Sequence, residues 1–556
     1  MKSGISKSLN SLQRKSLLAR MGSEPYDLLV IGGGITGAGV ALDAASRGLK
    51  VALIEKRDFG SGTSSKSTKL IHGGLRYLKQ LEIALVREVG RERTILHRNA
   101  PHIVIPENML LPIVANGSLG KRSTSIGLYA YDMLAGVRRK ERRVMLSLQE
   151  TLQYEPLLRK EILLGGGLYK EYRTDDARLT IEVMKTAAQY GADAMNYVAA
   201  NNFIYENNVA IGVEATDSIS GQQLQIGAKK IVNAAGPWVD ELRAKDNSLK
   251  GKKLHLTKGV HIVVPFQRLP LQQAVYFDVA DKRMVFAIPR GKSTYIGTTD
   301  TNYKGEIDHP TTTRADVDYL LKATNYMFPS IHLSIEDVTS SWAGLRPLIH
   351  EEGKGPSELS RKDEIFYSPS GVISIAGGKL TGFRKMAERT VDVVVKQLEE
   401  EQNRKFRECF TDNIVLSGGG FDYDDAIHSY INRIKIQQQF AALGISTEQV
   451  IDLVYKYGTN TTSVLDLLPQ TNTQDSLDMR IAAAEVMYGI EHEMVTNLSD
   501  FFTRRTGMLY FERNNIEQLF PAVEEKLALM LGWTEAQRDE QEQVFRLEYL
   551  QAVSFE

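Results

Sequence analysis

Six residues near the start of the chain have glycine spacing that could bring a backbone turn against phosphate. Residues 32–37 read Gly-Gly-Gly-Ile-Thr-Gly. Gly32 permits a tight turn, Gly34 lets the backbone approach a pyrophosphate, and Gly37 lets a helix pack closely on a strand. The helix that follows would offer unpaired N–H groups and the positive end of its dipole to phosphates. This spacing predicts that the turn binds a dinucleotide.

An acid that can bind a ribose hydroxyl follows at the expected place. Glu55 comes directly after the apolar run 51–54, and an earlier apolar run covers residues 28–31. Between them, residues 35–47 have a helical pattern, so the whole is typical of a parallel β–α–β unit. Because turn, helix, second strand and acid agree, we predict a nucleotide cofactor at residues 26–55.

An acid at this position suits NAD and FAD alike, and three later segments favour FAD. The polar segment 60–67 follows the second strand and could line another wall near the pyrophosphate. Residues 233–236 end a strand with a small-residue turn, as close approach to a ligand demands. Residues 375–381 join a strand to a helix, whose amino terminus could stabilise negative charge on a reduced flavin ring. A site assembled from both ends of an α/β region suits a long ligand such as FAD.

The elements that position these groups predict an α/β fold with a Rossmann-type FAD-binding domain. A chain of 556 residues is too long for one hydrophobic core. From residue 24 to about 410, short apolar runs alternate with helical stretches. β-rich pieces interrupt this pattern. We expect them to form an inserted substrate-binding or cap region, from about residues 80–165 and 250–345, that covers the cofactor.

The end of the chain predicts a separate α-helical domain. A Ser-Gly-Gly-Gly stretch at residues 417–420 is typical of a linker. Beyond it, Ser446 with Gln449 and Thr534 with Gln537 match the pattern that begins helices. We therefore expect a C-terminal helical domain over residues 421–556.

The beginning of the chain is a basic leader, residues 1–23, with five Lys or Arg residues and no acid before Ser23. Ile5, Leu9 and Leu12 recur at helical spacing, so the leader could lie on an anionic membrane surface. A disordered, solvated tail is the simpler interpretation. No run approaches the ~20 apolar residues of a membrane span.

Composition excludes some classes of function and leaves others open. Lys plus Arg equals Asp plus Glu at 68 each, so overall charge gives no argument for a nucleic-acid partner. Cys409 is the single cysteine, which excludes an intrachain disulfide and a cysteine metal cluster. The histidines show no metal-ligand spacing with carboxylates, and we predict no metal site.

Several segments together resemble a known family. They are residues 26–55, 64–78 with the run His-Gly-Gly-Leu-Arg-Tyr-Leu, 234–238, 297–300, 344–347 and 377–381. Over about residues 24–550 the chain resembles the FAD-dependent, aerobic, quinone-linked glycerol-3-phosphate dehydrogenases. No segment resembles the extra insertion of related oxygen-using oxidases, which favours a dehydrogenase.

The resemblance implies an oxidoreductase of glycerol metabolism. Such a flavoprotein oxidises sn-glycerol 3-phosphate to dihydroxyacetone phosphate and passes electrons through FAD to a membrane quinone, menaquinone or ubiquinone. It implies a cytoplasmic protein docked peripherally on the membrane, with no nucleic-acid partner, and it is compatible with a homodimer.

Motif and resemblance together predict the residues that bind FAD. They are Gly32, Gly34, Ile35, Thr36, Gly37, Glu55, Lys56, Ser64, Ser65, Lys66, Ser67, His72, Gly73, Gly74, Val198, Ala235, Gly236, Gly344, Gly378, Lys379, Leu380 and Thr381. One departure from the family is visible: the common Lys-Leu-Thr-Thr-Tyr-Arg is Lys-Leu-Thr-Gly-Phe-Arg at residues 379–384. A hydroxyl contact from position 382 or 383 is therefore not expected here.

A phosphorylated substrate calls for arginines, whose forked geometry matches phosphate. By resemblance, the predicted substrate-binding residues are Arg76, Tyr77, Arg283, Arg346 and Thr381. Lys379 is expected near both flavin and substrate, and with Arg346 it belongs to the predicted catalytic set.

The implied reaction is a formal hydride transfer from substrate C2 to flavin N5, and it needs a base for the C2 hydroxyl proton. His261 is the preferred catalytic base and His72 the second candidate, because histidine titrates near neutral pH. Hydroxide polarised by an arginine, or a water, is the remaining alternative.

Two other functions share the cofactor motif. An amine or amino-acid oxidase would need a carboxylate clamp and no phosphate site, and the motif-placed arginines disfavour it. A non-enzymatic flavin-binding protein at the membrane surface, using its helical domain for partners, would bind the cofactor without turnover.

Overall fold

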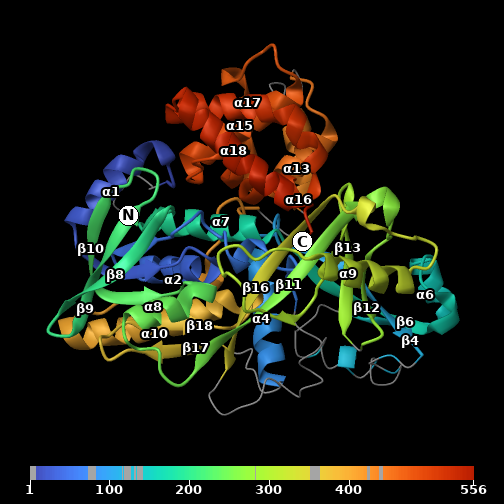
Figure 1. The fold of residues 1–556 in the computed structure, drawn as a ribbon, viewed down its shortest axis with the longest axis horizontal. Helices are drawn as coiled ribbons and strands as arrows, with labels where there is room; N and C mark the ends of the chain where they lie inside the picture. Colours follow the sequence, from blue (N-terminus) through green and yellow to red (C-terminus); the bar gives the residue numbers. More distant parts are fainter. Residues whose placement is uncertain are drawn as a thin grey trace.

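Two β-sheets lie beside each other, and the C-terminal helices gather on one side of them (Figure 1). The computed structural model describes residues 8–72, 83–115, 142–281, 283–350, 363–421, 426–436 and 443–555, with a few isolated positions within 116–141.

The first sheet contains the predicted β–α–β unit. In hydrogen-bonded order its strands are β17 (Glu364–Tyr367), β18 (Ile373–Ala376), β10 (Gln223–Asn233), β1 (Tyr26–Ile31), β2 (Val51–Ile54) and β7 (Asp193–Met195), and β9 (Val209–Asp217) and β8 (Val198–Glu206) extend it beside β10. β18, β10, β1, β2 and β7 are parallel. Every residue of β1 and β2 is buried, which explains their unbroken apolar runs.

Helices cover this sheet, and one of them begins at the glycine turn. They are α2 (Ile35–Ser46), α7 (Asp176–Gln189), α8 (Val239–Lys245) and α10 (Phe383–Gln402). α2 contacts both α7 and α10. The approach is close because Gly39 leaves room for the Phe383 ring, which a Cβ at residue 39 would meet at 2.9 Å. The predicted helices at 35–47 and from 384 are confirmed within one residue.

The second sheet is mostly antiparallel. Its strands run in the order β15 (Thr301–Asn302), β11 (Lys253–Pro265), β14 (Ser293–Gly297), β13 (Met284–Arg290), β12 (Ala274–Asp278), β4 (Ile105–Val114), β6 (Leu163–Arg173) and β3 (Leu70–Ile71), with β16 (Ser340–His350) beside β11 and β5 (Val144–Leu146) beside β6. The helices of this part are α4 (Ile83–Asn99), α6 (Leu148–Tyr154) and α9 (Arg314–Met327). The expected β-rich pieces at 284–289 and 293–298 are β13 and β14.

The C-terminal part is helical, as predicted. It contains α11 (Ala426–Ile436), α13 (Thr447–Tyr457), α14 (Thr461–Leu465), α15 (Leu477–His492), the π-helical turn η13 (Asp500–Arg505), α16 (Met508–Phe511), α17 (Arg513–Leu531) and α18 (Glu535–Gln551). Ser446 and Thr534 form the expected capping boxes. The stretch 417–420 is not a free linker, because the backbone N–H of Ser417 donates to Thr186 Oγ1 at 2.9 Å and residues 417–419 are buried.

The leader is folded over residues 8–23, so the interpretation as a solvated tail is wrong there. α1 (Arg14–Ser23) follows a short 3-10 turn, η1 (Ser11–Gln13), and buries Leu17, Leu18 and Met21 in the core. Arg14 forms a buried ion pair with Asp217. Of the three apolar residues predicted to face a membrane surface, Leu9 is buried and Leu12 is 52% exposed, while Ile5 lies outside the described residues. Among the described residues, no helix is long and apolar enough to cross a bilayer.

The close backbone approach at the glycine turn predicts a sharp effect of one methyl group. A Cβ at residue 37 would lie 1.9 Å from the carbonyl oxygen of Gly32, which is backbone and cannot rotate away. We expect Gly37→Ala to cost about 1–3 kcal/mol through overpacking and to lower the melting temperature by about 1–3 °C. Differential scanning fluorimetry measures this shift.

Gly22→Ala in α1 is the matched control, because a Cβ there meets nothing closer than 3.8 Å. We expect an unchanged or slightly higher melting temperature, since alanine favours a helix. Equal melting temperatures for the two variants would contradict the argument.

Candidate active site

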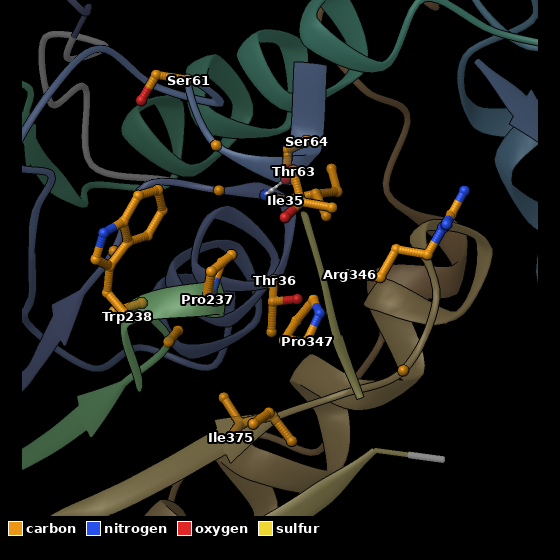
Figure 2. A pocket seen from close by; sticks show the side chains of 18 of the residues that line it. Ile35, Thr36, Ser61, Thr63, Ser64, Pro237, Trp238, Arg346, Pro347 and Ile375 are labelled. Atoms are coloured by element: carbon orange, nitrogen blue, oxygen red, sulfur yellow. Dashed lines mark hydrogen bonds between the residues drawn. The ribbon is translucent and has the colours of Figure 1, made fainter. Parts of the chain in front are cut away.

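A cavity of about 520 Å³ opens where the carboxyl ends of β1, β10 and β18 meet the second sheet. Figure 2 shows its wall: Ile35 and Thr36 come from α2, Pro237 and Trp238 from the turn after β10, Ile375 from β18, and Arg346 and Pro347 from β16. In a parallel sheet this edge is the usual ligand site, because loops diverge there and leave a crevice.

The glycine turn forms one side of the cavity. Gly32 has a φ of +111°, which glycine adopts without strain. A Cβ at Gly32 would lie 2.6 Å from the carbonyl oxygen of Ala234, so the turn packs directly on the end of β10. α2 has Gly34 as its N-cap and no acid in its first turn, and Ser64 Oγ accepts a hydrogen bond from the backbone N–H of Ile35 at 2.9 Å. The amino terminus of α2 therefore presents the positive end of its dipole to the cavity, where it favours a phosphate.

Glu55 lies at the end of β2 in the cavity wall, as predicted. Its carboxylate accepts hydrogen bonds from the backbone N–H of Gly33 at 2.6 Å and of Arg57 at 2.9 Å. Burial raises the pKa of Glu55, and these two N–H groups oppose the shift. Beside it, Lys56 Nζ lies 4.2 Å from the centroid of the Trp238 ring, another wall residue.

Most residues predicted to bind the cofactor lie in this wall. The wall contains Gly32, Gly34, Ile35, Thr36, Glu55, Lys56, Ser64, Lys66, Ser67, His72, Val198, Ala235, Gly236, Gly344, Gly378, Lys379, Leu380 and Thr381. Gly37 and Ser65 are not part of it: Gly37 packs against Gly32, and the Ser65 carbonyl accepts from Lys69 Nζ at 3.0 Å. Gly73 and Gly74 lie outside the described residues.

Arg346 is the predicted substrate arginine that the structure brings to the cavity. It stands on β16 opposite Thr257 of β11, and its guanidinium donates to Thr298 Oγ1 at 2.8 Å and pairs with Asp300 at 3.3 Å. A Cβ at residue 259 would lie 2.3 Å from Arg346 Nη2, so Gly259 makes room for the guanidinium. The side chain is 29% exposed, which leaves it accessible to a ligand.

The other predicted substrate residues within the described part of the chain are Arg283 and Thr381. Arg283 is not in the cavity wall: it pairs with Asp281 at 2.6 Å and lies over the Tyr319 ring, with 39% of its side chain exposed. Arg76 and Tyr77 fall outside the described residues. Thr381 and Lys379 are in the wall on the turn before α10, and Thr381 Oγ1 donates to the carbonyl of His72 at 3.3 Å.

His261, the preferred base, lies one layer behind the wall. Its ring stacks on Trp342 with centroids 4.9 Å apart, and its Nε2 lies 3.1 Å from Thr68 Oγ1. Thr68 itself is in the wall. Burial lowers the pKa of His261 well below its ordinary value, and the positive charges of Arg346 and Lys69 lower it further. The imidazole is therefore neutral at physiological pH. The Thr68 hydroxyl lies between the imidazole and the cavity.

Sequence reasoning missed one helical face of the wall. Trp238, Glu241, Leu242 and Lys245 all line the cavity from the turn before α8 and from α8 itself. Their spacing of three, four and seven residues is the spacing of one helix face, and this signal was available in the sequence. Ala199, Ala200 and Asn201 of β8 also line it. We find no advance signal for these three, because their polarity does not alternate as in a half-buried strand.

The wall fits a long ligand with a central pyrophosphate. It runs from the amino terminus of α2 past the Glu55 carboxylate and on to the turn before α10. Among the described residues, no group of three or more His, Cys, Asp or Glu side chains could hold a metal ion.

Comparisons with known proteins agree with this geometry. Residues 27–384 match the family of FAD dependent oxidoreductases, and residues 409–538 match the C-terminal domain of alpha-glycerophosphate oxidase. The X-ray structure of the glycerol-3-phosphate dehydrogenase from Bacillus halodurans complexed with FAD superposes with a TM-score of 0.84 at 45% identity, covering 98% of this chain and 99% of that chain.

Curated relatives match over nearly the whole chain. The aerobic glycerol-3-phosphate dehydrogenase of Bacillus subtilis (strain 168) is 52% identical over 529 residues, 95% of each chain. That of Staphylococcus haemolyticus (strain JCSC1435) is 48% identical over 534 residues, 96% of each chain. The chain therefore belongs to the aerobic glycerol-3-phosphate dehydrogenases, a family of FAD-dependent oxidoreductases.

Proposed function

We propose that the protein oxidises sn-glycerol 3-phosphate to dihydroxyacetone phosphate at this cavity and passes the electrons from FAD to a membrane quinone. The observation that carries the proposal is the position of Arg346. A positive, partly exposed arginine on the second sheet lines a cavity that the nucleotide turn also lines. A phosphorylated polyol could therefore be bound beside a flavin.

The wall residues divide into a group for FAD and a group for the substrate. The α2 amino terminus, Glu55 and the turn before α10 would hold FAD, which when bound accepts the hydride equivalent from substrate C2 at its N5. Arg346 would hold the phosphate or the oxygen at C2, since a guanidinium donates two parallel hydrogen bonds to such a group. Lys379 and Thr381 would bind the remaining oxygens. Arg76, Tyr77 and Arg283 stay predictions for the same substrate.

A base must remove the C2 hydroxyl proton as the hydride leaves. His261 is neutral, so its Nε2 can accept a proton, and Thr68 Oγ1 lies between that nitrogen and the cavity. We propose that the proton passes through this hydroxyl to His261. His72, which is itself in the wall, and a hydroxide or water polarised by Arg346 are the alternatives.

The remaining partners follow from the family. The curated relatives are called aerobic dehydrogenases. We propose menaquinone or ubiquinone as the electron acceptor, peripheral docking on the cytoplasmic face of the membrane, and a homodimer.

Anaerobic reduction of the purified protein tests the proposed function. We expect a yellow protein whose flavin absorbance near 450 nm bleaches on addition of glycerol 3-phosphate, because the hydride equivalent reduces bound FAD. Glycine and proline serve as controls for an amino-acid oxidase. Bleaching by an amino acid alone would overturn the substrate, and a flavin that nothing reduces would favour a non-enzymatic binding protein.

The role of Arg346 predicts a change in substrate affinity with the cofactor retained. We expect Arg346→Ala to raise KM for glycerol 3-phosphate about 10–100-fold, since a hydrogen bond to a charged group contributes about 1.5–3 kcal/mol. Steady-state kinetics with an artificial acceptor give KM, and visible absorbance reports bound FAD.

Two further arginine variants calibrate this result. Arg314→Ala removes an exposed pair with Asp318 far from the cavity wall, and KM should not change. Arg283→Ala decides whether that residue binds phosphate: a rise in KM supports the role, and an unchanged KM removes Arg283 from the site. An unchanged KM in Arg346→Ala would remove Arg346.

The lowered pKa of His261 predicts the pH dependence. Because the folded-state pKa lies well below 6.5, the neutral base is present throughout pH 6–8 and protonates only in more acidic solution. We expect kcat at saturating substrate to show no acid limb near pH 6.5. Saturation matters because the substrate phosphate itself titrates near pH 6. A limb near pH 6.5 that disappears in His261→Gln would contradict this prediction.

A further inference from the structure

The segment from Glu55 to Lys69 joins β2 to β3, and most of it lines the cavity. It is also packed onto the nucleotide turn. The backbone N–H of Gly60 donates to the carbonyl of Gly33 at 3.0 Å. The buried Phe59 ring lies so close that a Cβ at residue 33 would be 2.7 Å from it. A displacement of this segment would therefore displace both its own cavity wall and the turn that faces the pyrophosphate.

On the side away from the cavity, this segment is held by the C-terminal helical part through Asp58. Arg504 Nε donates to Asp58 Oδ2 at 2.5 Å. Arg505 forms a two-pronged pair with the same carboxylate, at 2.6 and 2.8 Å. Asn196 adds a hydrogen bond at 3.1 Å. The side chains of Asp58 and Arg505 are both 0% exposed, so water cannot replace these bonds.

The two arginines are in turn fixed by other groups. Arg505 Nη2 also donates to the carbonyl of Glu493 at 2.8 Å, and the Glu493 carboxylate accepts from Arg178 of α7 at 2.7 Å. The turn that carries the arginines, η13, contacts α7 directly, at the place where the C-terminal helices meet the first sheet's helices (Figure 1). The pair on Asp58 is therefore anchored to a rigid element of the cofactor-binding part.

A second tie reaches the same segment through Tyr197. Its backbone N–H donates to the carbonyl of Arg57 at 2.8 Å, and its hydroxyl donates to Asp500 at 2.7 Å. Asp500 also accepts from Arg504 Nη2 at 2.8 Å. Two residues lie next to Glu55: Arg57, and the wall residue Val198, which follows Tyr197 in the chain. Both are thus connected to η13.

The charges of this cluster extend to the cavity wall. Burial alone would raise the pKa of Asp58, but the guanidinium groups of Arg505 and Arg504 hold it below its ordinary value. Lys66, in the wall, has a pKa lowered to about 8, first by burial and also by Arg57 and Arg504, while Glu548 of α18 opposes the shift. Two residues of the helical part therefore act on a cavity lysine. Removing one member of a buried cluster leaves an uncompensated charge that the fold must relax around.

We propose that the C-terminal helical part holds the segment 55–69 in its FAD-binding conformation through Asp58, and that Arg504 and Arg505 are positioning residues for the cofactor site. They act on FAD through Asp58, Phe59 and Gly60, without touching the cavity wall themselves. The helical part thus supports the cofactor site from the side of the segment 55–69 that faces away from the cavity.

The test is FAD affinity of the full-length apoprotein, measured by titration with FAD well below the melting temperature of each variant. We expect Asp58→Asn and Arg505→Met to raise the Kd for FAD about tenfold or more, as residues coupled to a site through packed contacts do. Tyr197→Phe, which removes only one hydroxyl, should raise it about two- to fivefold. The visible circular dichroism of bound flavin should change in the same variants, because the wall around it is displaced.

Arg538→Met is the matched control, since Arg538 pairs with Glu524 in the same helical part but is 43% exposed. Its Kd should equal that of the unchanged protein. If Arg505→Met does not fold, Arg505→Lys and Tyr197→Phe decide by the same measure. A Kd within twofold of the control in every folded variant, even with a lowered melting temperature, would show that the cluster only stabilises the fold and would overturn the proposal.

Discussion

The close approach of three backbone segments at the end of β1 is the constraint on which the cofactor site depends. Gly32, Gly37 and Ala234 pack so tightly that neither glycine can carry a Cβ. This contact fixes where α2 begins and how its amino terminus points relative to β10. Because β10 leads into the turn with Trp238 and then into α8, the same contact also sets the position of the opposite wall. The position of the cavity is therefore set by the ends of the strands, and the side chains complete its wall.

Positive charge is the second property of the cavity. Arg346, Lys66 and Lys379 line the wall, and Lys69 lies behind it in an ion pair with Asp176. Burial, together with the positive charges of Arg346 and Lys69, disfavours protonation of His261. The positive side chains of the wall favour anions in the cavity, whether a substrate phosphate or the negative charge of a reduced flavin. In the function that we propose, one arrangement of charge would serve phosphate binding and electron transfer, and the neutral histidine would accept a proton.

The sequence predicted the parts of the fold whose signals are local. β1, β2, α2 and the capping boxes at Ser446 and Thr534 were found because apolar period, glycine spacing and cap chemistry act over a few neighbours. The leader was misjudged for the opposite reason. Leu17 and Leu18, which are buried, form only a weak helical stripe on their own, and α1 pairs through Arg14 with Asp217, two hundred residues away. Tertiary contacts of this kind leave no mark on the local pattern.

The arginines show why residue type alone could not assign the site. A functional role could be assigned from residue type to any of Arg346, Arg283 and Arg505, yet the surroundings of the three side chains differ. Arg346 is partly exposed in the cavity wall, Arg283 leans on Tyr319 outside it, and Arg505 is fully enclosed around Asp58. A guanidinium can bind a ligand only where its side chain reaches the cavity. Arg505 is instead buried, so its donors bind groups of the protein itself. Its rigid, forked guanidinium can hold the Asp58 carboxylate and the segment that carries it.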